Sequence, residues 1–178
     1  MKPADVVNFW IQAGPKVWFK KSKAFDAEIR QRFETQHHAA ARGELDGWAE
    51  TPEGALALLL LLDQFPRNLY RGSPHAFATD PLARKVARAA VDRGFDAQVD
   101  PELRQFFYLP FEHSEHLDDQ EHGVNLCAAS GDAELVKWAN IHRDIIARFG
   151  RFPHRNAALG RATTEAEQDF LDRGGFAG

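Results

Sequence analysis

Residues 51–72 read TPEGALALLLLLDQFPRNLYRG. Thr51, Pro52 and Glu53 have the features of a helix start: a side-chain oxygen for the N-cap, a proline in the first turn and an acid near the positive end of the helix. The apolar run at 55–62 would place hydrophobic side chains on every side of that helix, which is typical of a central, buried helix. The run is far shorter than the roughly 20 residues that cross a bilayer.

The rest of the chain repeats the helical pattern. Apolar residues recur at spacings of three and four, and the alternation typical of an exposed strand is hard to find. Asp80-Pro81 and Asp100-Pro101 repeat the helix-start signal, and Pro110 should kink or restart the helix that it interrupts. We expect helices at 5–12, 22–42, 51–64, 80–93, 100–109, 111–116, 118–129, 132–149 and 164–173.

The predicted fold class is therefore all-α. Consecutive helices joined by short turns favour antiparallel helical hairpins, arranged as a compact bundle or a short solenoid. A length of 178 residues fits one globular domain covering 1–178. A regular 34-residue repeat is not evident in the pattern.

Composition limits the partners and the compartment. The net charge is −4 and the isoelectric point about 6.1, so the chain lacks the basic field of a non-specific nucleic-acid binder, and we expect no nucleic-acid partner. Cys127 is the only cysteine and cannot form an internal disulfide. The absence of a leader-like or membrane-spanning segment predicts a cytoplasmic protein with no membrane partner.

Two segments resemble each other. LDQFPRNLYRG at 62–72 and FGRFPHRN at 149–156 both place Phe-Pro shortly before Arg and Asn. Such a turn could bind an anion through helix N–H groups and an arginine fork; in the structural interpretation, Phe anchors the turn, Asn bonds to local backbone and Arg pairs with a surface acid. The candidate ligand-binding residues are Arg67, Asn68, Arg71, Arg151, Arg155 and Asn156.

A third segment, 108–116, is rich in reactive side chains. His113 and Glu115 could form an acid–base couple, with His154 as a further proton carrier, or the segment could simply pack as a hydrogen-bonded helix. Glu112 and His116 have a spacing that allows a shared metal ion on a helix, but the metal-binding patterns of known helical sites are missing. We therefore predict no metal site.

The chain resembles the bacterial domain of unknown function 924 family, which belongs to the tetratricopeptide-like helical superfamily. The resemblance rests on VNFW at 7–10, WF at 18–19, LDQFPRNLYRG at 62–72, ATDP at 78–81, YLPFEHSE at 108–115, DQE at 119–121 and HRDIIARFGRFPHRN at 142–156. It implies a tetratricopeptide-like superhelix and no established activity. His116 and His122 stand where relatives are expected to carry an acidic and a basic residue, which leaves His113, Glu115 and Glu121 as the better correspondences.

Two functions from different classes follow. The first is a site for an anionic small molecule bearing a phosphate or carboxylate, which could be an enzyme that uses His/Glu acid–base chemistry. The alternative is a tetratricopeptide-like scaffold that binds a peptide or protein without catalysis. The sequence does not decide whether the protein is an enzyme, and it identifies no cofactor.

Overall fold

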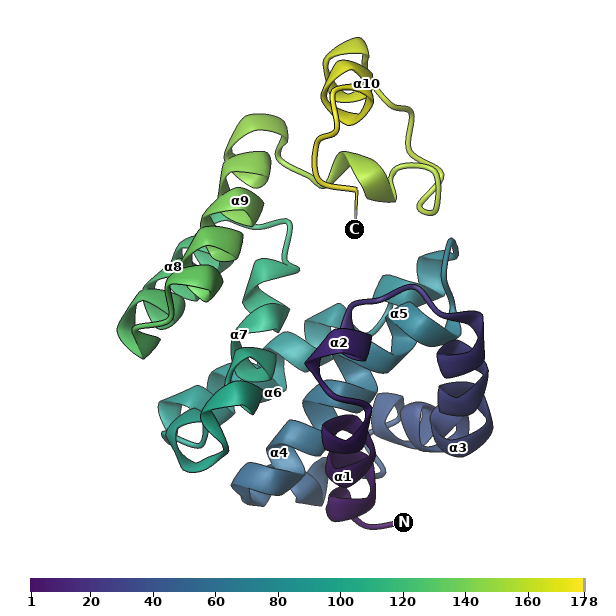
Figure 1. Ribbon diagram of the computed structural model, residues 1–178, viewed down its shortest axis with the longest axis vertical. Helices are drawn as coiled ribbons and strands as arrows, with labels where there is room; N and C mark the ends of the chain where they lie inside the picture. The colour runs from purple at the N-terminus through teal and green to yellow at the C-terminus, as the bar shows by residue number, and fades with distance from the viewer. Residues whose placement is uncertain (178) are drawn as a thin grey trace. The chain divides into compact units, whose positions relative to one another are not determined.

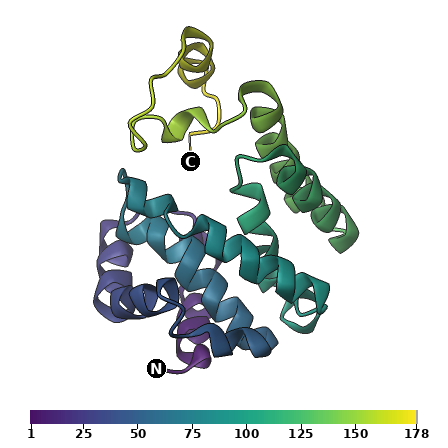
Figure 2. The ribbon, with the colours of Figure 1, turned by 180° about the vertical axis from the view of Figure 1, so that it is seen from behind.

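The structure is a computed structural model that describes residues 1–177, and all regular secondary structure in that range is helical (Figures 1 and 2). The predicted all-α fold class is confirmed. The tetratricopeptide-like superhelix stays a prediction. The α-helices are α1 (Pro3–Ala13), α2 (Pro15–Trp18), α3 (Lys23–Ala41), α4 (Pro52–Leu59), α5 (Phe65–Leu69), α6 (Asp80–Asp92), α7 (Gln105–Glu112), α8 (Leu117–Ser130), α9 (Ala133–Phe149) and α10 (Glu165–Asp172). Shorter helical turns are η1 (Asp46–Glu50), η2 (Leu60–Gln64), η3 (Pro74–Phe77), η4 (Asp96–Gln98), η5 (Pro101–Leu103) and η6 (Pro153–Arg155).

The chain divides into two compact units. Unit 1 comprises Met1–Arg71 and His75–Pro110, and unit 2 comprises Gly72–Pro74 and the chain from Phe111 onward. The single domain over 1–178 stays a prediction, and each unit is described by itself below.

Unit 1 is built around the central helix that its sequence predicts. The Thr51 hydroxyl accepts a hydrogen bond from the Gly54 N–H at 3.1 Å, which confirms the predicted N-cap. Every residue from Gly54 to Leu62 is buried, so the segment lies inside the unit on all sides. Aromatic rings from α1, α3 and α5 complete the core, with Phe65 in contact with Phe9, Trp10 and Phe33.

The central helix widens before it reaches Pro66. Residues Leu60–Gln64 form a π-helical turn between α4 and α5. Pro66 has no N–H to bond the Leu62 carbonyl, and the Thr79 hydroxyl donates to that carbonyl instead, at 2.5 Å. Nδ1 of His37 bonds the Leu61 carbonyl at 2.8 Å, and burial lowers the pKa of His37, which favours its neutral form. Side chains from α3 and from the start of α6 therefore satisfy the carbonyls of the irregular turn.

Unit 2 contains a helical hairpin made by α8 and α9, which lie side by side in both views (Figures 1 and 2). Gly131 joins the two helices with φ 77°, a left-handed conformation that glycine adopts without strain. The buried face of α9 consists of Ala139, His142, Ile145 and Ile146. Trp138 of the same helix is 45% exposed.

The end of α7 also differs from expectation. Pro110 lies inside α7, which ends at Glu112, so the predicted helix at 111–116 was wrong. The Gln120 side-chain amide donates to the carbonyls of Glu112 and Ser114, at 2.6 and 2.7 Å, and holds the turn that follows. Because Glu112 and His116 are not on one helix, the i, i+4 spacing that suggested a shared metal ion is not realised.

Within the described part of the chain, no helix combines the length and the hydropathy that a transmembrane span requires.

Candidate functional site

Arg67, from the first Phe-Pro segment, is held between two acids of unit 1. Its Nη1 and Nη2 atoms donate to the two carboxylate oxygens of Asp80 at 3.0 and 3.1 Å, and Nη1 also lies 3.3 Å from Asp63 Oδ1. The side chains of Asp63 and Asp80 are only 1% and 7% exposed. Burial lowers the pKa of Arg67, but the charges of Asp63 and Asp80 outweigh it, so the net pKa is raised and the guanidinium stays charged.

Asn68 and Arg71 converge on a different acid, Asp26 of α3. Arg71 binds the Asp26 carboxylate with two parallel hydrogen bonds, Nε to Oδ2 at 2.6 Å and Nη2 to Oδ1 at 2.9 Å. The Asn68 amide donates to Oδ1 at 2.8 Å. Burial raises the pKa of Asp26. The hydrogen bonds from Arg71 and Asn68 and the charges of Arg71 and Arg30 lower it by more, so the net pKa lies below the usual value and the carboxylate is ionised at neutral pH.

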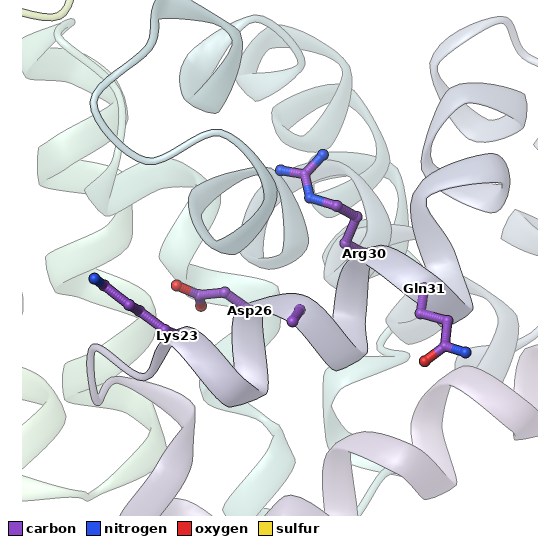
Figure 3. Close-up of a pocket in the computed structure, with 5 residues that line it drawn as sticks. Lys23, Asp26, Arg30 and Gln31 are labelled. Atoms are coloured by element: carbon purple, nitrogen blue, oxygen red, sulfur yellow. The ribbon is translucent and has the colours of Figure 1, made fainter.

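A shallow hollow of about 390 Å³ lies on α3 beside this carboxylate, lined by Lys23, Asp26, Ala27, Arg30 and Gln31. Figure 3 shows Lys23, Asp26 and Arg30 projecting from successive turns of the helix. Arg30 is anchored by Glu34, with Nη1 2.6 Å from Oε1, and by the Leu69 carbonyl. The first segment and α3 thus meet at an exposed surface that carries both signs of charge.

The second and third segments meet in unit 2. The Glu115 carboxylate accepts the Phe152 N–H at 2.8 Å and two hydrogen bonds from Arg161, at 2.7 and 3.0 Å. Burial raises the pKa of Glu115, but these bonds and the charges of Arg161 and Arg155 outweigh it, and the net pKa lies below the usual value. At neutral pH Glu115 is therefore an ion-paired carboxylate that fixes the turn after α9.

A second acid, Glu167, organises the other residues of that turn. Nε and Nη2 of Arg151 donate to its two carboxylate oxygens at 2.6 and 2.8 Å, and the Asn156 amide donates at 3.3 Å. Arg161 links the two acids, because its Nε donates to Asn156 Oδ1 at 3.0 Å. Glu167 also forms a capping box with Thr164 at the start of α10. The sequence carries no local signal for the role of Arg161.

The other three predicted residues also lie in unit 2. The Arg155 guanidinium carbon lies 4.5 Å from the centroid of the Phe152 ring, and the residue is only 6% exposed. The ring of His154 lies 5.6 Å from that of Phe152, and the ring of His113 lies 6.4 Å from that of His142. Ligand binding by Arg155 and acid–base roles for His113, Glu115 and His154 stay predictions.

The Arg151–Glu167 pair predicts an acid-sensitive contribution to stability. Hydrogen bonds from Arg151, and then from Thr164, outweigh burial and hold the pKa of Glu167 at about 2, against an ordinary value of 4.5. A lowered pKa in the folded state means that the stabilisation is complete above pH 4.5 and is lost as the pH falls toward 2. Glu167→Gln should therefore lower the melting temperature at pH 7 much more than at pH 3, as measured by circular dichroism.

The control for this prediction is Glu134→Gln, which removes an acid that is 71% exposed and pairs with Lys137 in α9. That variant should shift the melting temperature little at either pH. An equal loss for Glu167→Gln at pH 7 and pH 3 would contradict the assignment.

Comparisons with known proteins identify the family of the chain and support its fold. The family model described as bacterial protein of unknown function (DUF924) matches residues 6–175. A solved structure, the protein of unknown function ATU0120 from Agrobacterium tumefaciens, is 52% identical in sequence, with a TM-score of 0.93 over 97% of each chain. A search of curated proteins found no match. The chain belongs to the DUF924 family of bacterial proteins of unknown function.

Proposed function

We propose that the protein binds a small anionic molecule, with a carboxylate or phosphate group, at the hollow on α3 beside Arg71. The observation that carries this proposal is the way Asp26 is held. Three N–H donors from Arg71 and Asn68 surround its carboxylate in the geometry that proteins use for carboxylate and phosphate ligands. The hollow opens directly beside that internal carboxylate.

The charges around the hollow favour an anion. Lys23, Arg30 and Arg71 are positive, and the acids paired with them are Asp26 and Glu34, which leaves one net positive charge. The Arg71 side chain is 37% exposed, so part of it is accessible to a ligand. In this proposal Lys23 and Arg30 attract the ligand, Arg71 adds a third positive charge beside it, and Asn68 holds Asp26 in place.

The remaining predicted arginines support the folded chain in this proposal. Arg67 and Arg151 have their hydrogen bonds directed at buried acids of their own unit. Catalysis is not part of the proposal, because Glu115 is already paired with Arg161. The peptide-binding scaffold stays a prediction: the exposed large apolar side chains belong to separate elements, with Phe19 after α2 and Leu82 in α6, for example.

Isothermal titration calorimetry with inorganic phosphate and with succinate, at low salt, tests the proposal. Asp26→Asn keeps the side-chain shape and removes the competing negative charge, so it should tighten binding by about tenfold. Lys23→Met should weaken binding by a similar factor. Arg42→Met removes an equal charge at the far end of α3, from a side chain that is 59% exposed, and should leave the affinity unchanged.

Opposite shifts in Asp26→Asn and Lys23→Met, with Arg42→Met unchanged, support a site at the hollow. The proposal is overturned if neither anion binds the wild-type protein or the Asp26→Asn variant at tens of millimolar. Equal weakening by Lys23→Met and Arg42→Met would instead reveal only a general effect of net charge.

A further inference from the structure

The segment after α10 turns back onto α9 within unit 2. Gly174 has φ 78°, which strongly favours glycine, and the Gly175 N–H bonds the Phe170 carbonyl at 2.9 Å. A Cβ atom at Gly175 would lie 2.5 Å from that same carbonyl oxygen, so only glycine permits this approach. The two glycines thereby direct Phe176 toward α9.

Phe176 occupies a seat made of aromatic rings and aliphatic side chains. Its ring centroid lies 4.6 Å from that of His142, 5.3 Å from that of His154 and 6.5 Å from that of Trp138. The same ring packs against the buried cluster of Ile145, Ile146 and Phe152. Phe176 itself is only partly buried, although the seat below it belongs to the core of unit 2.

An ionisable pair lies beneath this ring. Nδ1 of His142 is 3.5 Å from Glu112 Oε2 and 2.8 Å from the Trp138 carbonyl, and the two side chains are 8% and 4% exposed. The Cys127 thiol donates to Glu112 Oε1 at 3.6 Å, and burial raises the pKa of that thiol, so it stays protonated. An imidazole backed by a carboxylate is thus covered by one phenyl ring.

We propose that Phe176 occupies the place of an aromatic ligand, and that residues 173–177 form a strap over a binding site built on His142 and Glu112. The seat accepts one six-membered ring, since it already holds one. Its aromatic and aliphatic walls favour a flat apolar body, and the edge-to-face packing of the Phe176 ring on the His142 imidazole favours an aromatic one. The class of ligand is therefore a small aromatic molecule.

Displacement of the strap is physically accessible. Phe176 is only partly buried, and segments with few buried contacts open at the lowest free-energy cost. Only the open form of the protein binds a ligand that competes with the strap. The apparent affinity is therefore the intrinsic affinity multiplied by the fraction of open protein. Shortening the Phe176 side chain should therefore expose the site and raise the affinity for the ligand.

The test uses phenol as the probe and the full chain as the protein. Phe176→Ala should bind phenol at about millimolar concentration, the range expected for so small a ligand, and at least about tenfold more tightly than the wild type. Cyclohexanol should bind the variant more weakly than phenol. Modification of His142 by diethylpyrocarbonate, followed by mass spectrometry, should also be faster in Phe176→Ala.

Phe19→Ala is the matched control, because it removes a phenyl ring that is 61% exposed and belongs to unit 1, away from the strap in the sequence. It should leave both phenol binding and His142 modification at wild-type levels. In the wild-type sequence, 4-fluorophenylalanine at position 176 should give a second fluorine NMR signal as phenol displaces the ring. This measurement does not depend on the folding of an alanine variant.

The proposal is overturned by either of two results. One is equal phenol affinity in the wild type and in a folded Phe176→Ala variant. The other is an unchanged fluorine spectrum of the labelled wild-type chain at tens of millimolar phenol.

Discussion

Arg67→Met is expected to lower the free energy of unfolding by about 3–5 kcal/mol, the range found when one partner of a buried ion pair is removed. The side chain is 20% exposed, whereas the Asp63 and Asp80 side chains that it lies between are 1% and 7% exposed. Without the guanidinium, the two carboxylates lose the cation that offsets their mutual repulsion. Urea unfolding followed by tryptophan fluorescence measures the loss.

Two further variants separate the charge effect from the loss of packing. Arg71→Met removes the same charge four residues later, but its partner Asp26 is 18% exposed and water can solvate it, so the loss should be clearly smaller. Adding Asp80→Asn to Arg67→Met removes one of the two acids and should restore part of the stability. If Arg67→Met costs less than Arg71→Met, the pairing with buried acids is not what holds α5.

The sequence predicts helix starts well because their signals are local. The Thr51 cap depends on Thr51 and Gly54 alone, and it forms as expected. The turn at 113–116 was missed because its position depends on Gln120, which reaches back to the carbonyls of Glu112 and Ser114.

The partners of the candidate site residues were not predictable, because the pairs are distant in the sequence. Arg71 bonds Asp26 across 45 residues, and Arg161 bonds Glu115 across 46. In the sequence, several Asp and Glu residues are equally plausible ion-pair partners for each arginine. Only the packing of the helices determines which of them lies close enough to pair. The residue types at the site were therefore foreseeable from the Phe-Pro segments, while their pairing was not.

In both Phe-Pro segments the phenylalanine anchors the turn, as their sequences predicted. Phe65 and Phe152 are both 0% exposed, and a buried proline follows each of them. In unit 1 the phenyl ring anchors the start of α5, directly after the π-helical turn. The interpretation of each Phe as the anchor of its turn is therefore confirmed.

Phe65→Ala should accordingly be among the most destabilising single substitutions in unit 1. The Phe65 ring centroid lies 5.1 Å from that of Phe33 and 5.6 Å from that of Trp10. Removing it leaves a cavity at a fully buried position, for which about 3–5 kcal/mol is the usual loss of unfolding free energy. Urea denaturation monitored by circular dichroism measures this loss independently of the nearby Trp10.

The control is Phe19→Ala, which removes an identical ring that is 61% exposed and should change stability by no more than about 0.5 kcal/mol. A loss below about 1 kcal/mol for Phe65→Ala would mean that the core closes around the missing ring. In that case α5 would be positioned mainly by the polar contacts of Arg67 and Asn68. The losses measured for Phe65→Ala and Arg67→Met thus divide the anchoring of α5 between apolar packing and ion pairing.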